Sequence, residues 1–302
     1  MTQDTTPTKP LEVSPRDYHT RLTCNRANIF DHNSFLSKSV IWELNESSLY
    51  RWRHNPKDQA EVAAKIAVQD GTIIDCLITT PEEIDDITAV HDYPDFRSKE
   101  AREFRDDALA AGRVPVSREK MGDYNKAARM FFTHPTVGPI VKASRKQVIC
   151  IGTVCEIQSK CLVDIDGGES RILWDIKRTA RLSRDNLEKT IADFGYYIQA
   201  AWYLHLWNQQ HPDRPKDRFG FLWQCSEPPY EIVATELPSF DIEAGRDWVR
   251  YHCEKLKTAT ETGHWPGIFG DQITMLGRPG YAAMKDEFLY DEPVAAPAIL
   301  PV

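Results

Sequence analysis

The chain has 302 residues, of which 41% are apolar and 27% are charged, and its formal net charge is −8. This length suits one large domain or two ordinary ones, and the composition is typical of a folded globular protein. The acidic balance argues against nonspecific coating of nucleic acid, but it is compatible with an enzyme that has a local basic groove.

Neither a membrane segment nor a metal-cysteine motif is expected. No run of 18 or more apolar residues occurs, and the polar, Pro/Thr-rich start lacks the apolar core of a secretory signal. The seven cysteines are scattered without a Cys-x-x-Cys pair, which argues against a zinc ribbon or an iron–sulfur cluster. We therefore expect a reduced, cytoplasmic protein.

The N-terminal half is predicted to be mostly helical, after a flexible lead at residues 1–16. Helical patterns recur at residues 37–53, 63–78, 97–112 and 117–133. The first pattern is interrupted near Asn45 or Ser47, and the third ends at Gly112, a typical C-cap residue.

From residue 145 the pattern changes to short β-rich runs, at 145–157, 159–166 and 170–179. One helix is predicted over 186–207, two strands around a Pro-Pro turn over 218–237, and a last helix over 240–262. The simplest interpretation is one α/β domain, in which a helical N-terminal half caps a small mixed sheet.

Two aspartates and a lysine fall on neighbouring strands of this predicted sheet. Asp175 and Lys177 are two residues apart in "ILWDIKRT", so they point to the same face. If a hairpin forms through Gly167-Gly168, Asp164 approaches Asp175 on that face. Close carboxylates repel each other unless a cation lies between them, and oxygen ligands suit Mg²⁺ or Mn²⁺. The alternative is a surface hairpin with an ordinary Asp–Lys ion pair.

The next predicted helix carries a polar and aromatic stripe beside its apolar one. Tyr196, Gln199 and Tyr203 lie at positions i, i+3 and i+7 of this helix. This stripe could overlook a metal site formed by the strands. Amphipathic packing at the edge of the core explains it equally well.

Asp164, Asp175-Ile176-Lys177 and Gln199-Ala-Ala-Trp-Tyr203 together resemble the motifs of the PD-(D/E)XK nuclease superfamily, specifically its RecB-like branch. Longer segments resemble the exodeoxyribonuclease VIII (RecE-type) phage recombination exonucleases. They are "LSKS" at 36–39, "YPDFRSKEAREFRDDALAAGRVPVS", "DFGYYIQAAWY", "FGFLWQCSEPPYEI" and "ETGHWPG". The similarity runs from about residue 36 to 268 and implies a PD-(D/E)XK, restriction-endonuclease-like core.

This resemblance implies one nuclease domain over residues 17–283, with a helical part at 17–140, a catalytic core at 141–283 and a flexible tail at 284–302. It also implies a Mg²⁺-dependent 5′→3′ exonuclease on linear duplex DNA, with Mn²⁺ as a possible substitute and two ions in each site. The resulting 3′ overhangs would pass to a single-strand annealing protein, and the subunits would form a homo-oligomeric ring.

Residue roles follow from the same resemblance. Asp164, Asp175 and the backbone carbonyl of Ile176 would bind metal, and Lys177 would position or activate the attacking water. Gln199, with Tyr196 and Tyr203 on the same helix, would orient the site or the DNA strand.

One position departs from the family pattern. The family has a histidine ligand in a Gly-Thr/Ser-x-x-His element, and "GTIID" places Asp75 there. A carboxylate still suits Mg²⁺, so we expect Asp75 to be a metal ligand, the alternative being a capping or solvent-exposed residue.

Three arginines follow the catalytic motif, at positions 178, 181 and 184. Arg178, Arg181 and Arg184 are candidates for contact with DNA phosphates, and a solvated loop is the alternative. Two other functions remain open for the whole chain: a RecB-like DNA endonuclease for repair, and a non-catalytic DNA-binding protein with a nuclease fold.

Overall fold

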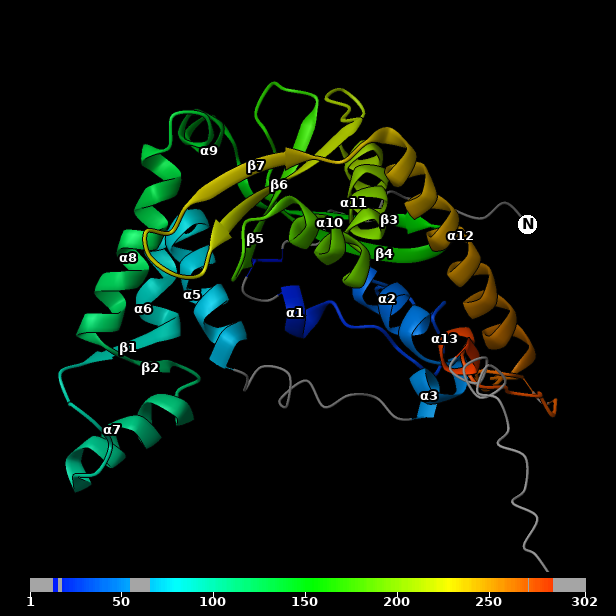
Figure 1. The fold of residues 1–302 in the computed structure, drawn as a ribbon, viewed down its shortest axis with the longest axis horizontal. Coiled ribbons are helices and arrows are strands. Elements are labelled where there is room, and N and C mark those ends of the chain that lie inside the picture. The colour runs from blue at the N-terminus through cyan, green and yellow to red at the C-terminus, as the bar shows by residue number, and fades with distance from the viewer. Residues whose placement is uncertain (1–12, 16–17, 55–65, 271, 285–302) are drawn as a thin grey trace, which may run out of the picture.

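A five-stranded mixed sheet runs through the centre of the computed structural model (Figure 1). In spatial order β3 to β7, its strands are Lys146–Val154, Ile157–Ile165, Ile172–Thr179, Arg218–Cys225 and Ile232–Glu236. β5 and β6 are parallel, and the other neighbours are antiparallel. All the predicted strand runs are therefore confirmed.

The structure describes residues 13–15, 18–54, 66–270 and 272–284. Most of the expected flexible lead and nearly all of the expected tail lie outside these residues. Within them, no helix combines the length and the apolar character needed to cross a bilayer.

β4 and β5 diverge into a fork. Among the described residues their ladder consists of Ile165 paired with Trp174, although β4 pairs with β3 along its whole length. Further along β4, Leu36 occupies the place of β5: its N–H donates to the Gln158 carbonyl, and its carbonyl accepts from the Lys160 N–H, both at 2.8 Å. A fork leaves strand backbone groups available to side chains, so carboxylates can lie within the sheet.

One face of the sheet is covered by helices from both ends of the chain. They are α2 (Lys38–Glu46), α3 (Leu49–His54), α11 (Tyr196–Gln210) and α12 (Ser239–Thr262). Phe219, Phe221 and Trp223 alternate along β6 and are fully buried in this layer. Period-two alternation places their neighbours on the opposite face.

The opposite face packs against a second helical layer. Its helices are α5 (Ile66–Thr79), α8 (Arg118–Thr133) and α9 (Val137–Ala143). Ile172, Trp174 and Ile176 of β5 are buried in this layer, so the residues between them, including Asp175, face α11.

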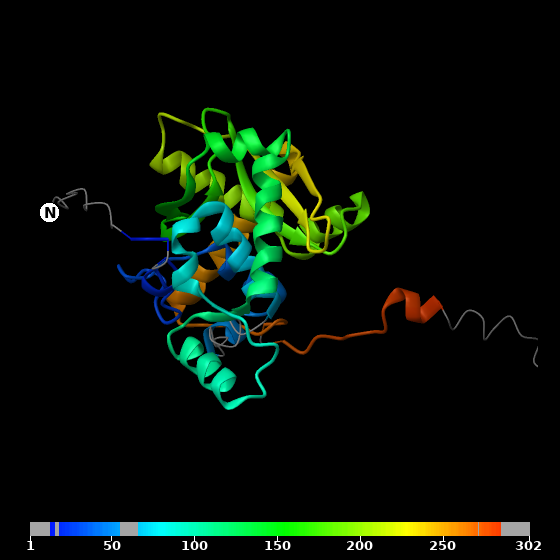
Figure 2. The ribbon, with the colours of Figure 1, turned by 90° about the vertical axis from the view of Figure 1, so that its left-hand side faces the viewer.

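Smaller elements complete the described structure. β1 (Thr88–His91) and β2 (Val114–Ser117) form a separate parallel pair beside α7 (Lys99–Ala110), which lies beyond the second layer (Figure 2). The sequence patterns predicted α7 but not this pair of strands. The remaining short elements are α1 (Tyr18–Arg21), η1 (Pro81–Glu83), α6 (Ile84–Ile87) and α13 (Gly280–Ala283).

The single helix predicted over residues 186–207 is wrong. The structure has α10 (Arg184–Asp193) and then α11, separated by Gly195 with φ 59° and ψ 42°. A side chain at Gly195 would meet the Trp42 ring at 2.2 Å. The apolar stripe of that predicted helix would consist of residues 187, 191, 194, 198 and 202, but Phe194, which precedes this break, is 54% exposed and does not belong to it. Hydrophobic periodicity continues across the break, so it could not reveal the break.

Candidate active site

A cavity of about 390 Å³ lies at the fork between β4 and β5. Eight of the predicted site residues line it: Asp75, Asp164, Asp175, Ile176, Lys177, Tyr196, Gln199 and Tyr203. They come from α5, both strands of the fork and α11. The fold therefore brings together side chains that lie more than a hundred residues apart in the sequence.

Asp175 and Lys177 form an ion pair inside this cavity. The Asp175 side chain is 3% exposed and that of Lys177 is 20% exposed, so this is not the surface ion pair of the alternative reading. Gln199 Nε2 donates to Asp175 Oδ1 at 2.5 Å. The carboxylate is thus held from the strand by an ammonium and from α11 by an amide.

Asp164 lies at the opening of the fork. Its Oδ2 accepts a hydrogen bond from the Ile176 backbone N–H at 3.0 Å, where a continuous sheet would have a strand carbonyl. The side chain of one strand thereby substitutes for the backbone ladder with the other. This contact fixes Asp164 next to Asp175.

Asp75 reaches the cavity from α5, on the far layer. Neighbouring residues Ile73 and Ile74 are buried in that layer and orient the helix. Asp75 Oδ1 is buried and has no hydrogen-bond partner among the described residues. Asp75 Oδ1 therefore accepts no capping hydrogen bond and is not exposed to solvent, contrary to the alternative considered for this residue.

Burial and neighbouring charge disfavour ionisation of Asp75 and Asp164. Burial, opposed by the charge of Lys177 and assisted by that of Asp175, raises the pKa of Asp75 to about 7. Burial, followed by the charges of Asp175 and Asp75, raises the pKa of Asp164 well above its usual range. Burial disfavours the Lys177 ammonium, but Asp175, Tyr196 and Asp164 outweigh it and raise the lysine pKa. An additional cation would relieve this repulsion.

The two tyrosines occupy different places in the cavity wall. The Tyr196 ring lies under the Lys177 ammonium, 4.6 Å from ring centroid to Nζ, and packs against Phe221 at 5.4 Å between centroids. Burial raises the pKa of Tyr203 well above its usual range, so its hydroxyl stays protonated. Tyr203 packs against Phe219 at 6.0 Å between ring centroids.

The sequence motifs did not reveal the basic wall of this cavity, which is formed by Lys38, Lys160 and His19. Lys38 Nζ donates to the Phe194 carbonyl at 2.7 Å, and Lys160 Nζ donates to the Tyr18 carbonyl at 2.9 Å. Burial lowers the pKa of each lysine to about 8. Lys160 could have been found from the period of two, because it and Asp164 occupy the same face of β4.

The three predicted DNA-binding arginines lie outside the residues that line this cavity. Arg178 is nearest, since its charge acts on Asp75, and it donates to the Ser226 carbonyl at 3.1 Å. The Arg184 side chain pairs with Glu188 at 2.7 Å and borders a different groove. Contacts of Arg178, Arg181 and Arg184 with DNA stay predictions.

The chemistry of the cavity fits a hard divalent cation, although its geometry does not yet form a ligand set. Within the described ranges, no three His, Cys, Asp or Glu side chains are grouped as metal ligands. Lys177, however, contacts the Asp175 carboxylate that would bind a cation, and Asp75 Oδ1 is buried without a partner in those ranges. Carboxylate oxygens are the ligands that Mg²⁺ and Mn²⁺ prefer.

Comparisons with known proteins agree with this architecture. A family model described as a PDDEXK-like domain of unknown function (DUF3799) matches residues 67–273. No curated protein matches the sequence. A solved structure from Eubacterium rectale, described as a "putative exonuclease", is similar with a TM-score of 0.52 and 12% identity, over 91% of this chain and 98% of that chain. The predicted PD-(D/E)XK core is thereby confirmed, whereas the narrower RecE-type resemblance stays a prediction.

Proposed function

Because the chain belongs to the family of PDDEXK-like domains of unknown function (DUF3799), we propose that it is a metal-dependent deoxyribonuclease. The observation that carries the proposal is the buried Asp175–Lys177 pair beside Asp164 in the strand fork. Buried, strongly interacting ionisable groups in a cavity are typical of catalytic sites.

Asp75, Asp164, Asp175 and the Ile176 carbonyl would hold the Mg²⁺ or Mn²⁺ ions, two in each site. When bound, such ions supply a deprotonated water at neutral pH and offset charge on the phosphate. Lys177 donates hydrogen bonds to the attacking water once its ammonium leaves Asp175. Gln199 fixes the Asp175 carboxylate through its 2.5 Å hydrogen bond.

The basic wall gives this site a means to hold a DNA strand. Lys38 and Lys160 line the same cavity as the carboxylates and would contact phosphate oxygens beside the scissile bond. Their burial means that each contact would be made with little screening by solvent. A phosphodiester in this cavity would thus be within reach of both the lysines and the carboxylate cluster.

The finer assignment is a 5′→3′ exonuclease on linear duplex DNA, and its support is the RecE-type sequence resemblance. Its 3′ overhangs would be the substrate of a single-strand annealing protein, and a homo-oligomeric ring around the duplex would keep digestion processive.

The test mixes purified protein and Mg²⁺ with linear duplex DNA labelled at the 5′ or the 3′ end, alongside a closed circle. We expect early loss of the 5′ label with the circle intact. Cutting of the circle would instead favour a repair endonuclease, and the absence of any Mg²⁺-dependent product would leave a non-catalytic DNA-binding protein.

Variants connect this activity to the cavity. Asp175→Asn and Lys177→Ala should each lower the rate by at least about a hundredfold, because each removes a group that acts on the reacting atoms. Lys126→Ala is the matched control, since this lysine is 72% exposed and pairs with Asp123 on α8. A hydrolysis rate that survives in both site variants would contradict the assignment.

A further inference from the structure

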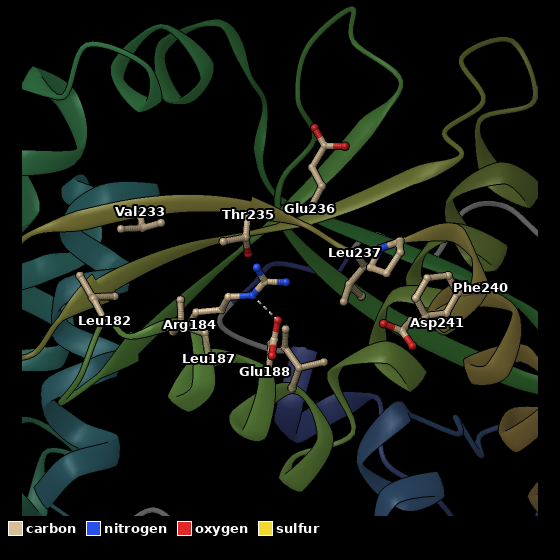
Figure 3. Close-up of a pocket in the computed structure, with 12 residues that line it drawn as sticks. Leu182, Arg184, Leu187, Glu188, Val233, Thr235, Glu236, Leu237, Phe240 and Asp241 are labelled. Carbon is tan, nitrogen blue, oxygen red and sulfur yellow. Dashed lines mark hydrogen bonds and ion pairs between the residues drawn. The ribbon is translucent and has the colours of Figure 1, made fainter.

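A second, larger cavity of about 610 Å³ is lined by none of Asp75, Asp164 and Asp175 (Figure 3). It is a groove between β7, α10 and the first turn of α12. Its wall is largely apolar and includes Leu187, Ile191, Val233, Leu237 and Phe240. Phe240, at one end, is 70% exposed. The site proposed above uses none of these residues.

Arg184, Glu188 and Glu236 at the rim of this groove are already paired, whereas Asp241 has no ion-pair partner among the described residues. Arg184 Nε donates to Glu188 at 2.7 Å, as Figure 3 shows, and Glu236 accepts from Arg218 Nε at 2.9 Å. The side chain of Glu236 also points away from α10 (Figure 3). An uncharged ligand would leave these pairs in place, whereas a charged ligand at Arg184, Glu188 or Glu236 would have to displace an existing pair.

The groove runs beside the edge of the main sheet. β7 is the last strand, and among the described residues it pairs with β6 alone. The Leu237 N–H donates to the Phe219 carbonyl at 2.9 Å, so by antiparallel alternation the backbone groups of Ala234 and Glu236 point away from β6. An open edge beside an apolar groove is the arrangement that binds extended peptides by strand addition.

This chain itself carries an extended apolar segment with no covering layer. In Gln272–Leu276, "QITML", the side chains of Ile273, Met275 and Leu276 are 103%, 95% and 74% exposed. The segment carries no charge, and Ile273 and Met275 would share one face of a strand. Its sequence thus complements the apolar wall of the groove.

The body of the protein holds the chain just before this segment. The Pro266 carbonyl accepts from the Tyr50 N–H at 3.0 Å, and Trp265 packs on Trp52 with 5.9 Å between ring centroids. Beyond that anchor the chain leaves the body on the side where β7 and α10 lie (Figure 2). An arm and a groove on the same side allow the arm of one copy to reach the groove of another copy.

We propose that residues 272–276 of a second copy add to β7 as an extra strand and place Ile273 and Met275 in the groove. The contact pairs two apolar surfaces that each copy leaves exposed, and it covers the open edge of the sheet. The occupant is thus the arm of a second copy of this chain.

Crosslinking of mixed variants tests the identity of the occupant. Protein carrying Ile273→Cys is mixed with protein carrying Val233→Cys and treated with a bismaleimide, and the unsubstituted chain serves as control for the native cysteines. We expect a crosslinked dimer in the mixture well above that of the control. A link that forms solely within one chain carrying both substitutions would overturn the proposal, as would no link above the control.

Sedimentation over a dilution series measures self-association and so tests the contact between arm and groove. Ile273→Asp/Met275→Asp on the arm and Phe240→Asp on the groove should each raise the dissociation constant at least about tenfold. Leu109→Asp, at another exposed apolar residue on α7 (53%), is the control and should change nothing. Mixing the arm variant with the groove variant should restore one contact and yield a mixed dimer. A parent protein that stays monomeric, or arm and groove variants that associate like the parent, would refute the docking.

Discussion

At the scale of single residues, the site depends on a lysine and an aspartate buried side by side. Their shared face could be predicted from their spacing of two on a strand. Their burial could not, because it depends on α11 and on the fork, neither of which the spacing specifies. Lys38 lies in the segment 36–39 that resembles the family, but the sequence gives it no role. Nothing in its local sequence shows that its Nζ lies 5.6 Å from the centroid of the Tyr196 ring.

The Asp175–Lys177 pair should therefore behave as a coupled unit. In metal-free protein, Lys177→Met leaves the Asp175 carboxylate buried without its cation and should lower the free energy of unfolding by about 3 kcal/mol. Asp175→Asn/Lys177→Met should cost less than the sum of the two single variants, by at least about 1 kcal/mol. Denaturant unfolding in the presence of EDTA measures all four proteins. If the losses of unfolding free energy in the two single variants add up to the loss in the double variant, Asp175 and Lys177 have no coupling energy.

His252 gives the fold a specific sensitivity to acid. It is 5% exposed and stacks on Trp248 in α12, and burial, assisted by Lys255, lowers its pKa to about 4. The unfolded chain takes up this proton near pH 6.5 and the folded one not until about pH 4, so stability falls as pH drops between these values. The loss reaches at most about 3 kcal/mol.

The substitution His252→Phe should flatten this part of the pH profile. The measurement is the urea midpoint at pH 7.5 and at pH 5, compared with that of the parent. His32→Phe is the matched control, because the His32 side chain is 87% exposed. If the variant and the parent lose the same stability over this range, His252 is not the group that titrates.

At the scale of elements, the type and order of most helices and strands could be predicted from the sequence, whereas the break within the helix predicted over 186–207 could not. The strands of the main sheet and the last helix were predicted near their observed bounds, because their hydrophobic periods are strong. The break between α10 and α11 was missed, since it depends on contact between Gly195 and Trp42, more than 150 residues apart. The strand pair β1–β2 was missed because each strand has four residues.

The joint at Gly195 sets the direction of α11 and thus the positions of Gln199 and Tyr196. Gly195→Ala forces a side chain into the Trp42 ring at a positive φ and should lower stability by about 2 kcal/mol or more, together with the rate of DNA hydrolysis. Gly71→Ala in α5 is the matched control: nothing lies within 4 Å of its Cβ, so this helix should gain about 0.5–1 kcal/mol. Thermal unfolding and hydrolysis rates measure both, and equal stability of the two variants would contradict the role of the joint.

At the scale of the whole molecule, the cavity joins the two helical layers across the sheet. Asp75 comes from the layer of α5, whereas Gln199 comes from α11 on the other face, and the fork is where they meet. The helical N-terminal half was predicted to cap the sheet. That it also supplies Asp75 and Lys38 to the cavity follows from layer packing, which a single sequence does not specify.

Binding of a divalent cation at this junction should therefore stabilise the entire fold. A cation at about a hundred times its dissociation constant adds about 2.7 kcal/mol, or roughly 4 °C in Tm for a chain of this size. Ca²⁺, Mg²⁺ and Mn²⁺ are added to EDTA-treated protein and unfolding is followed by calorimetry.

Variants locate the cation that causes this shift in Tm. Asp75→Asn and Asp164→Asn should abolish most of the shift, whereas Asp75→His should retain it with Mn²⁺, because imidazole also binds Mn²⁺. Asp217→Asn, at an exposed ion pair with Arg171, is the control and should keep the full shift. An equal shift in every variant would place the cation elsewhere, and no shift in the parent would remove the metal from the proposed mechanism.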